Sequence, residues 1–213
     1  SYIEDAGAPD LSIDLKTHWL GQSQDERSYE GALLRVENVD LKFVTKDSIF
    51  PSRRQYVRAC NNISFEIFEG ETFGLVGESG SGKSTIARAI TGLYPPDTGK
   101  IFFEGIDLTA LKGEHERRPL RRQMQMVFQN PYSSMNPRMK VRDIIAEPIR
   151  FHKLASSESQ IQGIVSDLLD HVGLGRGAGV KYPHEFSGGQ RQRISIARAL
   201  ATRPRFLICD EPT

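Results

Sequence analysis

The stretch GLVGESGSGKST, from Gly74 to Thr85, places glycines and small hydroxyl residues around a single lysine. Gly77, four further residues, and then Gly82, Lys83 and Ser84 match the G-x-x-x-x-G-K-[ST] pattern of a phosphate-binding loop. Glycines let backbone N–H groups wrap around phosphate oxygens, and the following helix adds the positive end of its dipole. We expect Lys83 to reach the β and γ phosphates of a nucleotide and the Ser84 hydroxyl to bind Mg²⁺. The predicted nucleotide-binding residues of this loop are Gly77, Glu78, Ser79, Gly80, Ser81, Gly82, Lys83, Ser84 and Thr85.

Two neighbouring acids could supply the rest of this chemistry. The segment RFLICDE is typical of a buried strand, and it ends in Asp210 and Glu211. A carboxylate at a strand end beside the phosphate loop can hold Mg²⁺ through its water shell, and we assign this role to Asp210. Glu211 is then the candidate for polarising the attacking water. Because acids also end many ordinary strands, this assignment depends on the lysine loop.

The segments on either side of the loop have the order that such a site requires. TFGLVG is a short apolar run that predicts a strand buried on both faces, and KSTIARAITGLY has helical spacing. A glycine-rich turn with an incidental lysine would not need this setting. The order strand, loop, helix therefore favours the phosphate site.

The rest of the chain predicts an α/β protein in two parts. Alternating residues in LLRVENVDLKFV and NNISFEIFEGE predict an antiparallel β layer, and MQMVFQNP predicts another strand that ends at Gln129. VRDIIAEPIRFH and SSESQIQGIVSDLLDHVGL predict two amphipathic helices, and SGGQRQRISIARALATRP predicts a third. We therefore expect a polar tail or linker over 1–31, a nucleotide-binding core over 32–134 and 186–213, and a helical subdomain over 135–185.

Composition excludes several other classes of protein. The net charge is +1, so the chain offers no global attraction for nucleic acid. No run approaches the eighteen apolar residues of a membrane-spanning helix. Cys60 and Cys209 stand far apart in apolar contexts typical of buried strands, so we expect no disulfide. The five histidines are never three or four residues apart, and we predict no metal site for them: His18, His115, His152, His171 and His184.

A second segment identifies the family that the chain resembles. FSGGQRQRISIARAL resembles the signature motif of ATP-binding cassette (ABC) ATPases, although Phe186 stands where the family usually has leucine. A serine cap and two glycines expose backbone donors at a helix start and make a second anion site. The resemblance implies that two cassettes pack head to tail, so that the signature of one covers the γ-phosphate bound by the other. The signature residues are Ser187, Gly188, Gly189 and Gln190.

Further matches extend this resemblance from about Leu33 to Thr213 and imply a P-loop NTPase core. Gln129 corresponds to the Q-loop glutamine, which contacts the Mg²⁺ and water region and leads into the subdomain that touches the membrane partner. Phe43 stands where the family has an aromatic that stacks on adenine, with Tyr56 as the alternative. Two segments are similar in sequence to the peptide, opine and nickel importer branch of the family: MVFQNPYSSMNPRMKVRDIIAEPI and YPHEFSGGQRQRISIARAL.

The resemblance implies an ATP-hydrolysing, energy-coupling subunit of an importer of dipeptides, oligopeptides or related solutes. It implies ATP and Mg²⁺ as ligands, a second cassette and transmembrane permeases as partners, a periplasmic solute-binding protein indirectly, and no nucleic acid. The expected location is peripheral, on the cytoplasmic side of the bacterial inner membrane. The family continues past DEPT with a D-loop and a switch histidine, so we expect a piece truncated after the Walker B strand.

Two other functions are compatible with parts of the sequence. A soluble ABC-type ATPase acting on ribosomes or nucleic acid would share every motif above. Chromosome-maintenance relatives, however, carry a long coiled coil between the lysine loop and the signature, and this chain has only about a hundred residues and no sustained heptads there. A non-catalytic nucleotide sensor would have no need of the acidic pair at Asp210 and Glu211.

Overall fold

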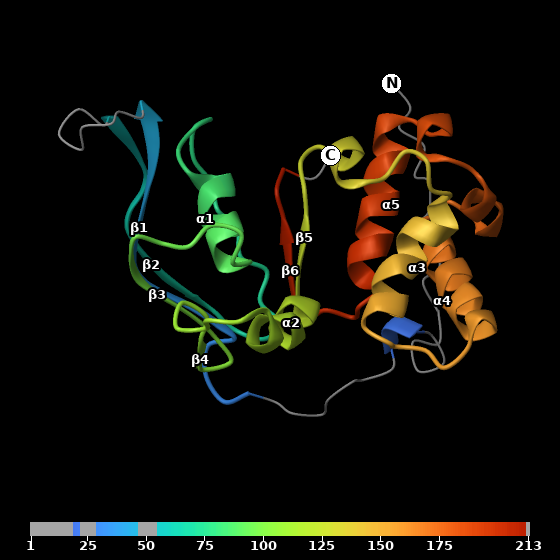
Figure 1. Ribbon diagram of the computed structural model, residues 1–213, viewed down its shortest axis with the longest axis horizontal. Coiled ribbons are helices and arrows are strands. Elements are labelled where there is room, and N and C mark those ends of the chain that lie inside the picture. The colour runs from blue at the N-terminus through green and yellow to red at the C-terminus, as the bar shows by residue number, and fades with distance from the viewer. Residues whose placement is uncertain (1–18, 22–28, 47–54, 212–213) are drawn as a thin grey trace, which may run out of the picture.

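The computed structural model describes residues 19–21, 29–46 and 55–211 and has an α/β architecture (Figure 1). An antiparallel sheet has the strand order β2-β1-β3-β4, and a separate parallel pair is formed by β5 and β6. The strands are β1 (Leu34–Lys46), β2 (Gln55–Ile67), β3 (Thr98–Phe103), β4 (Ile106–Asp107), β5 (Met124–Val127) and β6 (Phe206–Cys209). The helices are α1 (Lys83–Ile90), α2 (Glu114–Gln123), α3 (Val141–Phe151), α4 (Glu158–His171) and α5 (Gly188–Leu200). Short 3-10 turns cover Trp19–Gly21, Pro131–Ser134, Arg176–Val180 and Pro183–Glu185.

The antiparallel β layer predicted for the first part of the chain is confirmed. Leu34 pairs with Ile67 on β2 and with Phe103 on β3, which places β1 between its two neighbours. Leu34 and Val36 are buried, and after a break in register at Asn38 (φ 48°) the buried positions become Val39 and Leu41. Because successive side chains of a strand point to opposite faces, this irregularity keeps the apolar row on one face.

Helix α1 covers the apolar face of this β layer, as Figure 1 shows. Ile86, Ala89 and Ile90 of α1 form one buried cluster with β1, β2 and β3, and Phe206 and Ile208 of β6 pack against it. The helix begins directly after the phosphate loop, so the burial of its apolar stripe fixes where that loop lies.

The prediction of a buried strand over TFGLVG is wrong. Residues 71–78 form no strand, and the side chains of Phe73, Leu75 and Val76 are exposed, Val76 by 92%. A strand buried on both faces needs neighbours along its edges, and the described parallel sheet contains only β5 and β6. A cleft with a volume of about 540 Å³ lies between this segment, α1 and β6.

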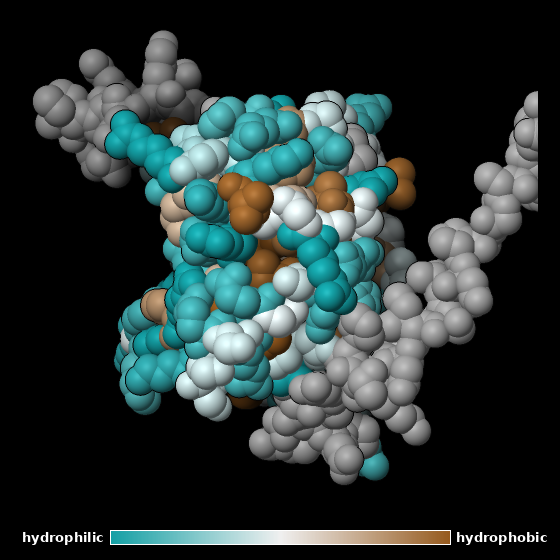
Figure 2. All heavy atoms as spheres, turned by 90° about the vertical axis from the view of Figure 1, so that its right-hand side faces the viewer, coloured by the Kyte–Doolittle hydropathy of each residue, from teal (hydrophilic) through white to brown (hydrophobic). Residues whose placement is uncertain are grey.

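The helical subdomain has its own apolar core. Its buried side chains come from α3, α4 and α5, and include Ile145, Leu168 and Ile194. Helix α5 therefore packs with the helical subdomain, whereas the predicted second part of the core began at residue 186. Phe186, 8% exposed, belongs to the same cluster, which gives an apolar role to the position where the family has leucine. The face of this subdomain in Figure 2 is mostly hydrophilic, with hydrophobic residues in small groups.

The 3-10 turn at Trp19 packs into this helical core from a distant part of the sequence. Trp19 is 6% exposed, and its Nε1 donates a 3.2 Å hydrogen bond to the Ala201 carbonyl oxygen at the end of α5. The guanidinium of Arg203 lies 4.0 Å from the centre of the indole ring. These contacts fall within 1–31, for which the polar composition predicted only a tail or linker.

Three further expectations concern individual features. The amphipathic helix predicted for SSESQIQGIVSDLLDHVGL is confirmed as α4, which begins after Ser157, whose hydroxyl accepts from the Gln160 amide, and ends before Gly173 (φ 70°). Both cysteines are free; Cys60 is buried, but Cys209 is exposed because one face of β6 is open. Among the described residues, none of the helices has the length and apolar character needed to cross a bilayer.

Candidate nucleotide-binding and catalytic site

The phosphate loop, Gly77–Ser84, turns sharply into α1. Gly82 has φ 94°, and a Cβ atom added there would lie 2.1 Å from the Ala59 carbonyl oxygen of β2. Only glycine combines this left-handed backbone with such a close approach. The loop therefore rests on β2 at Gly82, and its residues 77–81 stay exposed.

The side chain of Lys83 folds back over its own loop. Its Nζ donates hydrogen bonds of 2.9 Å to the Gly77 carbonyl oxygen and 2.8 Å to the Glu78 carbonyl oxygen. The ammonium group is thus held above the backbone that the sequence predicts to surround phosphate oxygens. A bound phosphate would compete for these donors with stronger, charge-assisted hydrogen bonds.

The start of α1 and the end of β6 meet at one hydrogen bond. Ser84 Oγ donates to Asp210 Oδ1 at 2.7 Å, although the two residues are 126 positions apart. Asp210 is 7% exposed, and its other oxygen, Oδ2, is buried without a hydrogen-bond partner in the part of the chain that the structure describes. A buried carboxylate oxygen without a partner is costly unless a cation or water satisfies it.

These residues fit a magnesium ion. Hydroxyl and carboxylate oxygens are the ligands that Mg²⁺ prefers, and the ion keeps several waters of its own. Ser84 Oγ and the Asp210 carboxylate are therefore the first candidates to hold it, and the exposed Gln129 is close enough to the acidic pair to join them. Groups of three or more His, Cys, Asp or Glu side chains that could hold a metal do not occur among the described residues.

The parallel pairing of β5 and β6 brings Gln129 beside Glu211. Val127 is in register with Cys209, and the Asp210 amide donates to the Val127 carbonyl oxygen at 2.9 Å. Both chains leave the sheet at the same edge, where Gln129 Nε2 donates a hydrogen bond to Glu211 Oε2. Glu211 has φ 47°, a left-handed conformation that is uncommon outside glycine and clusters at functional sites.

The two candidate aromatics lie on opposite faces of the β1–β2 ribbon. Phe43 is opposite Val57, whereas Tyr56 is opposite Val44. Since neighbouring strand positions alternate in direction, Phe43 continues the row of Val39 and Leu41 that faces α1, and Tyr56 points away from it. The Phe43 ring is 37% exposed.

The signature segment forms an exposed helix start. Ser187 caps α5: its Oγ accepts from the Gln190 amide at 3.3 Å, and Gln190 Oε1 accepts from the Ser187 amide at 3.0 Å. Residues 187–190 are all exposed. In Figure 1, α1 and α5 lie on opposite sides of the β5–β6 pair, so their starts do not converge on one point within the chain.

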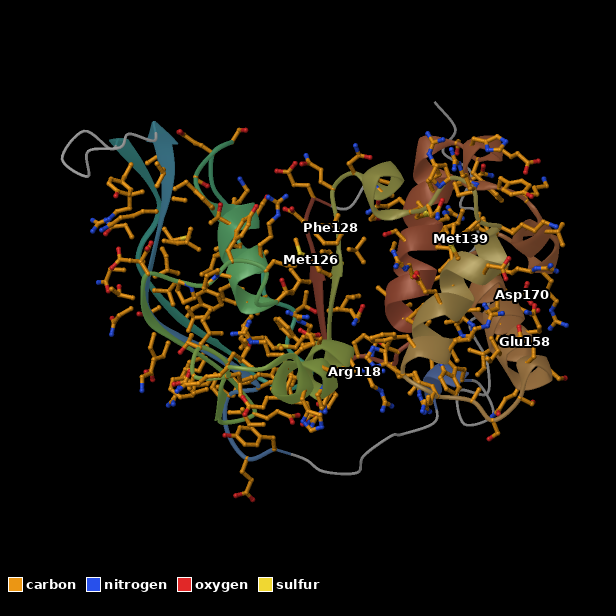
Figure 3. All side chains as sticks on the ribbon, viewed as in Figure 1. Arg118, Met126, Phe128, Met139, Glu158 and Asp170 are labelled. Atoms are coloured by element: carbon orange, nitrogen blue, oxygen red, sulfur yellow. The ribbon has the colours of Figure 1, made fainter. Side chains whose placement is uncertain are left out.

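A second cavity separates β5 from the helical subdomain. It measures about 420 Å³, and its walls include Met126 of β5 and Phe128 just after the end of that strand, both of which Figure 3 labels. Figure 3 also shows Arg118 of α2 beside the helical subdomain; its Nη2 donates to the Phe151 carbonyl oxygen at 2.8 Å, and its guanidinium lies 4.1 Å from the Phe151 ring centre. Neither α2 nor this contact was predicted from the sequence, since the segment EHERRPLRRQ contains a proline and few apolar residues.

Comparison with known proteins agrees with this geometry. The model of the family described as "ABC transporter" matches residues 60–213. The oligopeptide transport ATP-binding protein OppF of Streptococcus mutans is 53% identical over 180 residues, which are 84% of this chain and 56% of that protein. The OppF of Bacillus subtilis is 48% identical over 180 residues, or 84% of this chain and 57% of that protein. The chain thus spans about half the length of the curated relatives it matches.

Solved structures place the fold in the same group. The dimeric, ADP- and phosphate-bound post-hydrolysis state of the ATP-binding cassette MJ0796 superposes with a TM-score of 0.75 at 29% identity, covering 84% of this chain and 74% of that one. The cbiO1 structure of Clostridium perfringens has a TM-score of 0.68 at 27% identity, covering 86% and 67%. With the phosphate loop, the acidic strand end and the capped signature helix in place, the chain belongs to the ABC transporter family.

Proposed function

We propose that the chain is the ATP-binding and ATP-hydrolysing, energy-coupling part of an importer for oligopeptides, dipeptides or related solutes. The observation that carries the proposal is the hydrogen bond from Ser84 to Asp210, with the second Asp210 oxygen buried and unpaired. It unites the loop that would bind phosphates with the strand end that would hold Mg²⁺. The names of relatives 48–53% identical to the chain support the solute class.

The chain's own residues divide the work of nucleotide binding. The amides of the phosphate loop and the start of α1 would bind the phosphate oxygens, and Lys83 would exchange its carbonyl partners for the β and γ phosphates. Ser84 and Asp210 would hold Mg²⁺, with Gln129 at its edge. When bound, this ion would neutralise the negative charge that develops on the phosphate group.

Glu211 would act on the attacking water. Its carboxylate follows the metal-binding Asp210 directly and accepts a hydrogen bond from Gln129. A carboxylate in this position can orient the water and accept its proton. Gln129 leaves the same sheet edge and leads into the helical subdomain, so it would relate the state of the nucleotide to the position of that subdomain.

A second cassette would complete the site. The exposed amides at Ser187–Gln190 offer donors for an anion, and the arrangement of α1 and α5 on opposite sides of β5 and β6 supports their use by a partner copy. ATP would then close two cassettes, and hydrolysis would reopen them. Transmembrane permeases would convert this closure into transport on the cytoplasmic side of the bacterial inner membrane, and a periplasmic protein would deliver the solute.

Two variants test these roles separately. Lys83→Ala should abolish Mg-ATP binding by the chain in calorimetry, while the exposed control Lys100→Ala should bind like the parent. Glu211→Gln should retain ATP binding but abolish solute uptake in proteoliposomes that contain the assembled transporter. Uptake that continues unchanged with Glu211→Gln would refute the catalytic role, and the absence of Mg-dependent ATP binding by the parent would refute the proposal as a whole.

A further inference from the structure

Three side chains from three parts of the chain, Phe43, Arg88 and Tyr94, connect α1 with β1 of the antiparallel sheet. The ring of Tyr94, in the link from α1 to β3, meets the Phe43 ring of β1 at 5.2 Å between centroids and an interplanar angle of 78°. The guanidinium carbon of Arg88, in the last turn of α1, lies 5.9 Å from the centre of the Tyr94 ring. Tyr94 thus stands between the helix of the phosphate loop and an aromatic of the sheet.

The backbone around Tyr94 is fixed on both sides. Its amide donates to the Arg88 carbonyl oxygen at 3.2 Å, which anchors it to the end of α1. Three residues later, the Asp97 amide donates to the Asp40 carbonyl oxygen at 2.9 Å, and Asp97 Oδ2 accepts from the Lys42 amide at 2.6 Å. The link is therefore fastened to β1 immediately before Phe43. Tyr94 also packs against the buried cluster under α1, so its ring has little freedom to move.

The contact with Tyr94 leaves part of the Phe43 ring open. The two rings meet edge to face, a favoured geometry for aromatic pairs that covers less ring surface than stacking does. By contrast, Phe65 and Phe73 lie nearly parallel, at 9°. Phe43 remains 37% exposed on the face of β1 that α1 covers. A flat, apolar ligand group could stack on this exposed part.

We propose that Tyr94 is a positioning residue that holds the Phe43 ring as a stacking surface for the purine base of the bound nucleotide. This inference rests on the function proposed above and on the adenine stacking expected of Phe43, and it adds Tyr94 as the residue that positions the Phe43 ring. Arg88 connects Tyr94 to α1, whose first turn would bind the phosphates of the same nucleotide. Tyr94 should therefore affect the affinity for the base and leave the affinity for the phosphates unchanged.

The test compares a ligand that has a base with one that has none. Binding of Mg-ATP and of Mg-tripolyphosphate to the chain is measured by calorimetry for the parent, Tyr94→Leu and Tyr94→Phe. An aromatic contact of this kind predicts a roughly three- to ten-fold weaker affinity of Tyr94→Leu for ATP. Tripolyphosphate should bind equally well, and Tyr94→Phe should restore ATP affinity because the ring is retained. Phe102→Leu is the matched control, since Phe102 is on β3 of the same sheet and also lies under a cation, with Arg35 4.5 Å from its ring centre.

A double-mutant cycle separates positioning from a general structural effect. In a Phe43→Leu background, Tyr94→Leu should cause no further loss of ATP affinity, because its effect passes through the Phe43 ring. An equal loss of ATP and tripolyphosphate binding, additive losses in the cycle, or unchanged ATP affinity in Tyr94→Leu would each overturn the inference. If the parent binds neither ligand, the proposed function itself is wrong, and the inference is overturned with it.

Discussion

Ser84 and Asp210 are joined by a 2.7 Å hydrogen bond from the hydroxyl of one to the carboxylate of the other. The bond leaves Asp210 Oδ2 buried and unpaired among the described residues, directly beside the first turn of α1. The positive end of the helix favours a phosphate, and the buried carboxylate favours a divalent cation. A cation bound here can neutralise both the carboxylate and the phosphate. The pair is therefore the natural place to test the role of the metal.

Replacing Asp210 with Asn should weaken the dependence of ATP binding on Mg²⁺. The amide oxygen can still accept from Ser84, so the hydrogen bond is retained while the negative charge is removed. We expect the Mg²⁺-dependent part of ATP affinity to fall by roughly ten-fold or more, with ATP binding in EDTA unchanged or slightly stronger. Titration of a fluorescent ATP analogue with and without Mg²⁺ measures both quantities. Asp107→Asn, which alters a half-buried carboxylate on β4, is the control. Full Mg²⁺ dependence in Asp210→Asn would exclude the Asp210 carboxylate as a metal ligand.

Gly82 tests how tightly the phosphate loop rests on β2. In Gly82→Ala the new methyl group would meet the Ala59 carbonyl oxygen at 2.1 Å in addition to the strain of φ 94°. Gly80→Ala carries similar strain at φ 80° but has open space around it. We expect Gly80→Ala to cost about 1 kcal/mol of unfolding free energy and Gly82→Ala clearly more, about 2 to 3 kcal/mol. Urea unfolding measures the difference; equal costs would show that the contact with Ala59 is not limiting.

The sequence predicted the elements whose patterns are local. Alternation in LLRVENVDLKFV is set by residues two apart, and a serine cap is a signal local to the helix start, so β1 and the Ser187 cap of α5 could be predicted without knowledge of the fold. The reciprocal bond from the Ser187 amide to Gln190 is added by the structure. The residues of the phosphate loop and the acidic pair were found through their fixed spacing. That the loop and the acidic pair lie side by side was inferred from the motif. The structure supplies the hydrogen bond between Ser84 and Asp210, which are 126 positions apart.

The features that were missed depend on distant partners. TFGLVG has the composition of a buried strand, but a strand exists only where neighbouring backbone accepts its hydrogen bonds, and composition carries no information on that. Trp19 lies in a polar segment, and its burial depends on a site formed by α5 and Arg203, about 180 residues away. Tyr94 lies in the link after α1, and its contact with the Phe43 ring becomes apparent only once the structure places this link beside β1.

His152 should make the stability of the chain depend on pH. Burial, together with the positive charges of Arg122 and Arg118, lowers the pKa of His152 below its ordinary value. The unfolded state, with a histidine pKa of about 6.5, therefore binds more protons than the folded state as the pH falls through that region. Linkage then requires the free energy of unfolding to fall with it.

The measurement compares the urea midpoints of the parent and of His152→Gln at pH 7.5 and pH 5.5. The parent should lose stability at pH 5.5, and the variant should lose less because glutamine does not titrate. His184→Gln is a suitable control, since His184 is exposed and stacked on Tyr182. An identical loss in the parent and in His152→Gln would assign the pH dependence to other groups.

Trp19 should contribute strongly to the stability of the helical subdomain. Its ring is 6% exposed within the core of α3, α4 and α5, so Trp19→Ala should cost about 3 to 5 kcal/mol of unfolding free energy. Trp19→Phe keeps an aromatic ring but loses the donor to the Ala201 carbonyl oxygen, and should cost about 1 to 3 kcal/mol. Since the chain has one tryptophan, its fluorescence reports this contact directly: emission should be blue-shifted in the folded parent and move to the red as urea unfolds it. Red-shifted emission from the folded parent, or a Trp19→Ala variant as stable as the parent by circular dichroism, would show that the contact does not form in solution.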